Sequence, residues 1–336
     1  MNAMQKQAVF HTEGPVLILA GAGSGKTTVL INRIGNLVKY GSAFESDSLP
    51  EDICKEDVDL LNRVLKGEKV NNPRLYSLLT VNPPRPYEIL AITFTNKAAG
   101  ELKERLEGLL SDDSRDIWAF TFHSACLRML RRFADRIGFS SHFTIYDTDD
   151  SKRVIKDCQK ELGIEDKLLP YKTILSHISR AKDMLITPEE YERENCGDVR
   201  LSNIAKAYKL YQQKLKKADA MDFDDIICYT VRLFEQNPDV LSFYQNKFRY
   251  IMVDEYQDTN HAQYMLVKLL SGAHRNICVV GDDNQSIYRF RGATIENILS
   301  FESQYKDAFT VRLEQNYRST GNILDAANAV IKHNVN

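Results

Sequence analysis

A glycine-rich segment near the amino terminus has the residue types and spacing of a phosphate-binding loop. It follows the apolar run Val16–Ala20, precedes a helical pattern that begins at Val29, and consists of Gly21, Ala22, Gly23, Ser24, Gly25, Lys26 and Thr27. Glycines let backbone N–H groups face a polyphosphate, and the amino end of a helix adds a positive dipole. The Lys26 ammonium can reach the β- and γ-phosphates, and the Thr27 hydroxyl can bind Mg²⁺. Because a strand and a helix flank the turn, the segment predicts a nucleoside triphosphate site rather than a chance glycine-rich turn.

Two adjacent carboxylates supply the complementary chemistry. Asp254 and Glu255 directly follow the apolar run Tyr250–Val253. An acidic pair at the end of a buried strand is costly unless it faces a cation or a base. We therefore expect Asp254 to hold Mg²⁺ and Glu255 to orient and deprotonate the attacking water. A helix N-cap is an alternative role for Asp258, but it does not explain the pair.

Short apolar runs predict the strands that position these groups. Four runs are apolar on both faces and are followed by polar residues, as at the carboxyl ends of parallel strands. They are Val16–Ala20, Ile89–Thr93, Tyr250–Val253 and Asn276–Val280. A fifth run, Phe309–Leu313, fits less cleanly. The pattern predicts an α/β domain with a parallel sheet.

Two stretches interrupt this pattern. Between residues 127 and 217, apolar residues such as Ile174, Ile178 and Ala181 recur at helical spacing, which predicts an all-helical insertion subdomain. Residues 41–86 contain an acidic cluster and a proline-rich end, which predict a surface insertion with one or two helices. A functionally neutral surface is the favoured interpretation of that insertion, and a partner-binding surface is the alternative.

The composition is that of an ordinary globular protein. The 336 residues are 43% hydrophobic and 27% charged with a net charge of −2, so bulk positive charge cannot drive nucleic-acid binding, although a local basic groove could. No apolar run approaches the ~20 residues needed to cross a bilayer, and the amino terminus lacks the apolar core of a signal peptide. We therefore expect a cytoplasmic protein with no membrane partner. The six cysteines form no C-x-x-C pair, which argues against a zinc or iron–sulfur site.

Six segments, in order along the chain, resemble the first motifs of superfamily 1 DNA helicases of the UvrD/Rep/PcrA type. They are Gly21–Thr27, Ile92–Ala99, Thr121–Ser124, Val253–Asp258, Gly281–Tyr288 and Glu314–Ser319. The resemblance extends over nearly the whole chain except residues 41–86. It implies a RecA-like P-loop NTPase domain that binds ATP and Mg²⁺ and acts on DNA.

The resemblance assigns further residues to the nucleotide. Gln5, together with Asn2, matches the glutamine motif that reads adenine. Gln285 matches the residue that contacts the γ-phosphate and the attacking water. Tyr317 would stack on adenine, and Arg318 would act as an arginine finger toward the γ-phosphate.

The resemblance also implies a path for single-stranded DNA, together with some departures from the family pattern. The loop begins with Ala20 instead of glycine, as is common in the family, and Thr28 replaces a frequent arginine, which would weaken nucleotide contacts. The positions that match the DNA path are Phe94, Asn96, His123, Tyr288, Phe290 and Arg291. Aromatic faces stack on any base, which explains sequence-tolerant binding without excess positive charge. Ordinary core packing remains an alternative for Phe94, and it is the favoured one for Phe122.

The predicted domain organisation follows from these elements. Residues 1–126 and 218–308 would form the RecA-like motor domain, residues 127–217 the helical insertion, and residues 309–336 the start of a second motor domain. We expect an ATP-dependent DNA helicase, a single-stranded DNA translocase with 3′-to-5′ polarity by family resemblance, that unwinds DNA in repair or replication. Its partners would be single-stranded DNA, junctions of single- and double-stranded DNA, repair or replication proteins, and the second motor domain of the same polypeptide.

Two other functions stay open at this stage. No later family motifs follow in these 336 residues, so we expect the chain to bind ATP·Mg²⁺ but to hydrolyse it slowly and not to unwind duplexes alone. A nucleotide-gated module that binds single-stranded DNA without productive turnover would behave in this way. The helicase part of a nuclease-linked subunit of the RecB/AddA kind is the other alternative.

Overall fold

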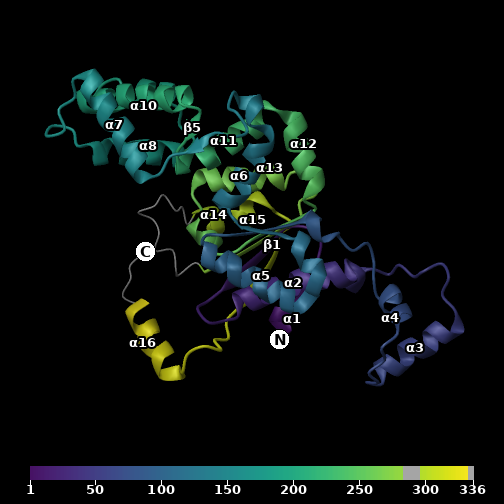
Figure 1. Cartoon of the computed structure of the whole chain (residues 1–336). Helices are drawn as coiled ribbons and strands as arrows, with labels where there is room; N and C mark the ends of the chain where they lie inside the picture. Colours follow the sequence, from purple (N-terminus) through teal and green to yellow (C-terminus); the bar gives the residue numbers. More distant parts are fainter. Residues whose placement is uncertain (283–295, 332–336) are drawn as a thin grey trace.

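The computed structural model describes residues 1–282 and 296–331, and a parallel sheet lies at its centre (Figure 1). Across the described sheet the strand order is β3-β2-β6-β7-β1-β8, and all neighbouring strands are parallel. The strands are β1 (Val16–Ala20), β2 (Ile89–Thr93), β3 (Trp118–Thr121), β6 (Tyr250–Val253), β7 (Ile277–Gly281) and β8 (Phe309–Leu313). The predicted α/β class with a parallel sheet is confirmed.

Two of these strands depart from the sequence prediction. β3, with the sequence Trp-Ala-Phe-Thr, is too short to stand out as an apolar run. β8 is an edge strand, and its exposed Arg312 explains why its pattern is less clear than that of the buried strands. β8 pairs with β1 along its whole length, so residues 309–313, predicted to begin a second motor domain, belong to this sheet instead.

Alternate residues of each strand feed two hydrophobic cores on opposite faces of the sheet. In β1, Val16, Ile18 and Ala20 pack into one core and Leu17 into the other, as the two-residue period of a strand requires. The first core is covered by α1 (Ala3–Phe10), α2 (Lys26–Tyr40) and α5 (Asn96–Leu110). The second is covered by α6 (Phe122–Phe133), α11 (Phe223–Gln236), α12 (Pro238–Lys247) and α13 (His261–Leu270). Figure 1 shows the two helical layers below and above the sheet.

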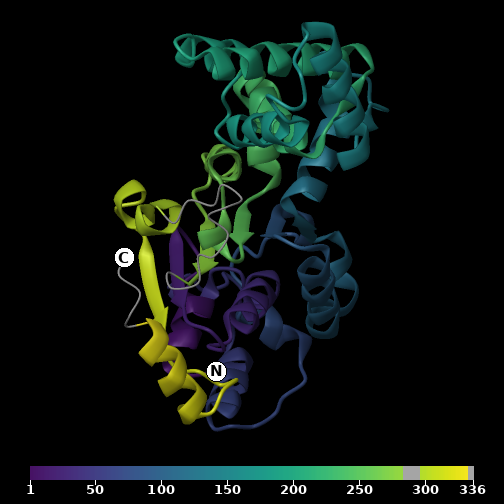
Figure 2. The ribbon, with the colours of Figure 1, turned by 90° about the vertical axis from the view of Figure 1, so that its left-hand side faces the viewer.

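A group of helices projects beyond the second layer (Figure 2). It contains α7 (Thr148–Leu162), α8 (Tyr171–Asp183), α9 (Pro188–Glu194) and α10 (Val199–Lys217), which share a separate core around Ile174, Tyr208 and Tyr211. The chain enters this group after β4 (Thr144–Ile145) and leaves it before β5 (Ala220–Met221), and these two short strands pair in parallel. The predicted boundary between residues 126 and 127 lies inside α6, whose apolar side chains pack on the sheet.

Residues 41–86 form an arm that extends away from the sheet (Figure 1). It contains η1 (Ala43–Glu45), α3 (Lys55–Leu65) and α4 (Pro73–Leu78), so the prediction of one or two helices is confirmed. The Arg74 guanidinium holds the arm together, with N–O distances of 2.8 Å to Asp52 and 2.7 Å to Asp57. Because the arm connects the end of α2 to the start of β2, it leaves the domain at the amino ends of the strands.

The remaining described helices are short. They are η2 (Pro86–Glu88), η3 (Ser111–Asp116), η4 (Ala134–Ile137), η5 (Tyr256–Asp258), α14 (Glu296–Leu299), α15 (Phe301–Gln304) and α16 (Gly321–Ile331). In the described ranges, no helix combines the length and the apolar character needed to cross a bilayer.

Candidate functional site

The glycine-rich loop and the carboxylate pair meet at the carboxyl edge of the sheet. The loop follows β1 and the pair follows β6, with only β7 between the two parallel strands. The Lys26 Nζ atom lies 3.0 Å from Glu255 Oε2, although the two residues are 229 positions apart in the chain. The structure therefore brings together the two segments from which the sequence predicts a triphosphate site.

The conformation of the loop depends on its glycines. Gly23 and Gly25 have φ angles of +70° and +87°, which side-chain-bearing residues rarely adopt. Ser24 closes the turn, since its backbone N–H and its hydroxyl both donate to the Gly21 carbonyl, at 3.2 and 2.7 Å. A Cβ at Gly23 would lie 2.7 Å from the Arg318 Cβ, so glycine also allows the segment after β8 to approach the loop.

That segment carries the residues predicted to contact the base and the γ-phosphate. Asn316 donates from Nδ2 to the Ala22 carbonyl, and its Oδ1 accepts from the backbone N–H groups of Arg318 and Ser319, each at 2.8 Å. The Tyr317 backbone N–H donates to the Gly23 carbonyl at 2.9 Å. These bonds place Tyr317 and Arg318, both exposed, directly beside the loop.

The helix α1 contacts the same loop through Gln5. The Gln5 amide donates from Nε2 to the Ser24 carbonyl at 3.0 Å, and its Oε1 accepts from the Asn2 backbone N–H at 3.0 Å. Asn2 in turn donates to the Tyr317 hydroxyl at 3.0 Å. Both ends of the Gln5 amide are thus used to connect α1 with the loop, while its predicted contact with adenine stays a prediction.

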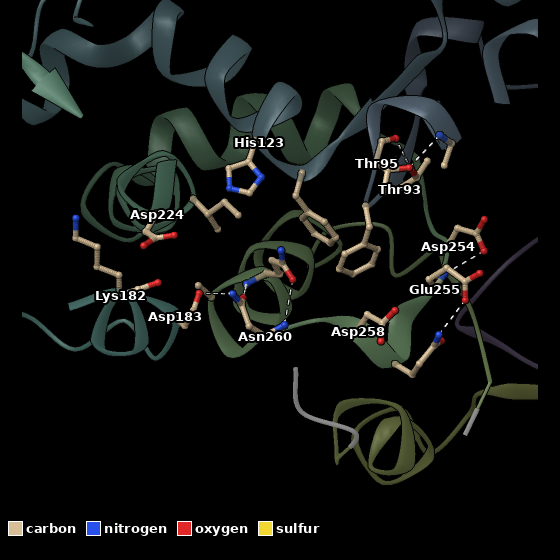
Figure 3. Close-up of a pocket in the computed structure, with 18 of the residues that line it drawn as sticks. Thr93, Thr95, His123, Lys182, Asp183, Asp224, Asp254, Glu255, Asp258 and Asn260 are labelled. Atoms are coloured by element: carbon tan, nitrogen blue, oxygen red, sulfur yellow. Dashed lines mark hydrogen bonds between the residues drawn. The ribbon is translucent and has the colours of Figure 1, made fainter. Parts of the chain in front are cut away.

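The carboxylates after β6 form an electrostatically unfavourable group. Asp254 is buried, and burial together with the negative charge of Glu255 raises the pKa of Asp254 to about 6. Burial and the charge of Glu255 likewise raise the pKa of Asp258 to about 6, and one Asp258 oxygen is buried with no hydrogen-bond partner among the described residues. Figure 3 shows these three acidic side chains at one end of a pocket.

The donor set suits a hard divalent cation. Mg²⁺ prefers oxygen ligands and reduces the repulsion between neighbouring carboxylates. The Thr27 hydroxyl and Asp254, the predicted Mg²⁺ ligands, line the same pocket, and the unpartnered Asp258 oxygen lies nearby. These residues therefore fit the cation that a bound triphosphate would bring.

The pocket has a volume of about 810 Å³ and continues away from the loop as a groove. Phe94, after β2, and His123, in α6, line it, and Ser176 and Arg180 of α8 form part of the far wall. Phe94 is partly buried, and its ring centroid lies 5.4 Å from that of Phe122. Burial lowers the pKa of His123, so its imidazole is neutral at pH 7 and can stack or hydrogen-bond without a charge.

The remaining predicted residues that the structure describes differ in their burial and in the element that carries them. Phe122 is only 2% exposed, which confirms its interpretation as a core aromatic. Asn96 is exposed in the first turn of α5, Ala20 is buried at the end of β1, and Thr28 is exposed in the first turn of α2. Four predicted residues lie outside the described ranges: Gln285, Tyr288, Phe290 and Arg291.

Comparison with known proteins agrees with this geometry. The family model described as the UvrD/REP helicase N-terminal domain matches residues 1–49 and 70–306. The chain belongs to the UvrD/REP helicase N-terminal domain family. Two relatives, both named ATP-dependent DNA helicase PcrA, come from Staphylococcus epidermidis, with 49% identity, and Staphylococcus aureus, with 48% identity. Each comparison covers 99% of this chain but 40% of the relative, so the chain spans less than half the length of these helicases.

The family match covers most of the described elements but not all of them. It leaves out residues 50–69, which include α3 of the arm. The match includes α7–α10, which shows that the projecting helices belong to the family domain.

The structure of this UvrD/REP domain reveals two site residues that the sequence did not single out. Gln257 is 1% exposed and donates from Nε2 to Glu255 Oε2 at 2.9 Å. Phe223, the first residue of α11, is 52% exposed, and its ring centroid lies 6.1 Å from that of His123. An exposed aromatic residue at the start of an amphipathic helix was the available signal for Phe223. Gln257 lies within the motif Val253–Asp258, but the sequence assigned it no role, because its role depends on contacts with residues that follow two different strands.

Proposed function

We propose that this chain is the ATP-binding motor portion of an ATP-dependent DNA helicase that moves along single-stranded DNA. One observation carries the proposal: a single groove is lined by nucleotide-site residues, Thr27 and Glu255, and by the candidate base-stacking residue Phe94. A change in nucleotide state can therefore act directly on bound DNA. The family membership and the names of the relatives support the same function.

In the proposed reaction each loop residue has a separate role. The backbone N–H groups of the glycine loop and the Lys26 ammonium bind the phosphates of ATP. Thr27 and Asp254 would hold Mg²⁺, which would supply positive charge to stabilise the negative charge of the phosphates. Glu255 orients the attacking water and accepts its proton. Arg318 and Gln285 contact the γ-phosphate, and Tyr317 stacks on adenine.

The DNA would lie along the groove. Phe94 offers an aromatic face and His123 a ring in the groove, Phe223 offers a second aromatic face beside His123, and Asn96 offers a polar contact. Tyr288, Phe290 and Arg291 complete the predicted path. Because the faces of all bases are similar, this arrangement predicts binding with little sequence preference.

The finer predictions belong to the same proposal. The six-stranded sheet with its two helical layers would act as the motor domain, with α7–α10 as its helical insertion and a second motor domain elsewhere in the same polypeptide. We propose 3′-to-5′ movement, action at junctions of single- and double-stranded DNA, repair or replication proteins as partners, and a cytoplasmic location.

ATP hydrolysis measured with and without oligo(dT) tests this proposal. We expect oligo(dT) to stimulate hydrolysis by the wild-type chain, and we expect Glu255→Gln to lower the rate by about 10²–10⁴-fold while ATP still binds. Lys26→Ala should weaken ATP binding itself. Hydrolysis by Lys26→Ala at the wild-type rate would contradict the proposal. Intact ATP binding with no stimulation by DNA would instead select a nucleotide-gated DNA-binding module.

A further inference from the structure

Gln257 connects the carboxylate of Glu255 to the end of a neighbouring strand. It lies in η5, and its side chain is almost completely buried. Its Nε2 donates to Glu255 Oε2 at 2.9 Å, and its Oε1 accepts from the Asp282 backbone N–H at 3.0 Å. A neutral amide is suited to this position, because it donates at one end and accepts at the other.

The neighbouring strand leaves space for this amide. A Cβ at Gly281, the last residue of β7, would lie 2.7 Å from Gln257 Oε1 and 2.5 Å from Ile298 Cδ1. Gly281 is not among the glycines with positive φ, so its backbone conformation does not require glycine. The close approach of the Gln257 side chain does require it.

The two side-chain donors to Glu255 differ in what nucleotide binding would do to them. Among the described residues, Lys26 and Gln257 donate to the Glu255 carboxylate, at 3.0 and 2.9 Å. In the proposed function Lys26 turns to the phosphates of ATP. Gln257 has no such second role, and its other end is fixed to the backbone of Asp282. It is therefore the donor that can stay on Glu255 while ATP is bound.

We propose that Gln257 is a positioning residue that holds the Glu255 carboxylate in place during ATP hydrolysis. This inference rests on the proposed function. In that reaction the water oxygen bonds to the γ-phosphorus while the bond from the γ-phosphorus to the bridging oxygen breaks. ADP leaves with the electron pair, and the proton of the water passes to Glu255. The hydrogen bond from Gln257 to Glu255 Oε2 fixes the orientation of the carboxylate that receives this proton.

Two substitutions separate the two ends of the amide. Gln257→Met has a similar length but neither hydrogen bond. Gln257→Glu keeps an oxygen for the Asp282 N–H, but it loses the donor to Glu255 and adds a second negative charge beside it. Gln159→Met is the matched control, because Gln159 is also a buried glutamine, donating to the Leu169 carbonyl at 2.7 Å in the projecting helices.

Single-turnover ATP hydrolysis at pH 8 with excess protein tests the inference alongside the binding of a fluorescent ATP analogue. We expect Gln257→Met to lower the hydrolysis rate constant by about 10- to 100-fold, with analogue binding changed less than about threefold. This separation of rate from binding is what a positioning role requires and a general loss of structure would not give. Gln257→Glu should also lower the rate constant more than it weakens binding, and Gln159→Met should change neither.

Several outcomes would overturn the inference. One is a rate constant of Gln257→Met that matches that of the wild type. Another is a loss of binding equal to the loss of rate, which would indicate a purely structural role. If Gln257→Met does not fold, Gln257→Glu decides by the same criteria, because it keeps the bond to Asp282. A wild-type chain that neither binds nor hydrolyses ATP would instead contradict the proposed function.

Discussion

Lys182 and the carboxylates of Asp254 and Glu255 lie along the same groove (Figure 3), and the charged clusters around them differ in whether their charges are matched. At the junction of α8 and α11, Lys182 Nζ lies 2.6 Å from Asp222 and 2.8 Å from Asp225, and the Tyr211 hydroxyl donates to Asp222 at 2.9 Å. At the carboxyl edge of the sheet, Lys26 pairs with Glu255, whose side chain is 40% exposed. Asp254, buried next to it, accepts from a backbone N–H.

The pKa values report this difference. Burial opposes the charge on Lys182 and lowers its pKa. The negative charges of Asp222 and Asp225 outweigh this effect, so the pKa of Lys182 lies above its usual value. Burial also opposes ionisation of Asp222, yet the shared ammonium holds its pKa below the usual range, while burial and Asp222 raise the pKa of Asp225 to about 6. The pKa of Asp254 is also raised to about 6. Among the described residues, Lys26 pairs with Glu255, and no lysine pairs with Asp254 as Lys182 pairs with Asp222. A cluster that contains its own cation is compensated within the fold, whereas one that lacks it suits a cation that arrives with a ligand.

The largest expected effect is a loss of stability when the cluster of Lys182, Asp222 and Asp225 loses its lysine. Lys182→Met should lower the free energy of unfolding by about 3–5 kcal/mol, because two buried carboxylates lose their cation. Lys26→Met should change it by less than about 1 kcal/mol, because its partner is partly exposed. Urea denaturation at pH 8 measures both. Equal losses for the two variants would remove the distinction between the clusters.

The second prediction concerns the pH dependence of stability. The pKa of Asp254 is about 6 in the folded state against 3.8 for the unperturbed group, so the unfolded state releases this proton first as pH rises. The residue therefore costs stability increasingly from about pH 4 to 6, and fully above pH 6. Without nucleotide, Asp254→Asn should raise the free energy of unfolding by about 2–3 kcal/mol at pH 8 and by little at pH 4. If Asp254→Asn is less stable than the wild type at pH 8, the conclusion that the ionised Asp254 carboxylate destabilises the folded state is wrong.

The smallest expected effect is on DNA affinity, and it compares the two neighbouring aromatic residues Phe94 and Phe122. Phe94→Ala should weaken the binding of oligo(dT) by about 1–3 kcal/mol, because a base-stacking face is lost. Phe122→Ala, a few ångströms away in the core, should instead lower the free energy of unfolding by about 3–5 kcal/mol. Fluorescence anisotropy and denaturant titration separate the two. Unchanged DNA affinity of Phe94→Ala would assign Phe94 to the core.

The sequence predicted those parts of the molecule that depend on local pattern. Buried parallel strands are short apolar runs followed by polar loops, so β1, β2, β6 and β7 were recognisable, and the sheet topology then placed Lys26 near Glu255. The links that complete the site were not predictable. Gln257 contacts Asp282 and Lys182 contacts Asp222 across 25 and 40 positions, and no spacing rule encodes such contacts.

Our interpretation of the cluster formed by Lys26, Asp254 and Glu255 depends on one event. A triphosphate and its magnesium must bind between the glycine loop and Asp254. The most direct measurement is the affinity for a non-hydrolysable fluorescent ATP analogue at pH 8, with and without Mg²⁺, in the wild type and in Asp254→Asn. We expect Mg²⁺ to strengthen binding to the wild type by about tenfold or more, about 1.4 kcal/mol, and to have little effect on the variant. Binding that does not depend on Mg²⁺ in the wild type, or an equal dependence in both proteins, would contradict the assignment of this site.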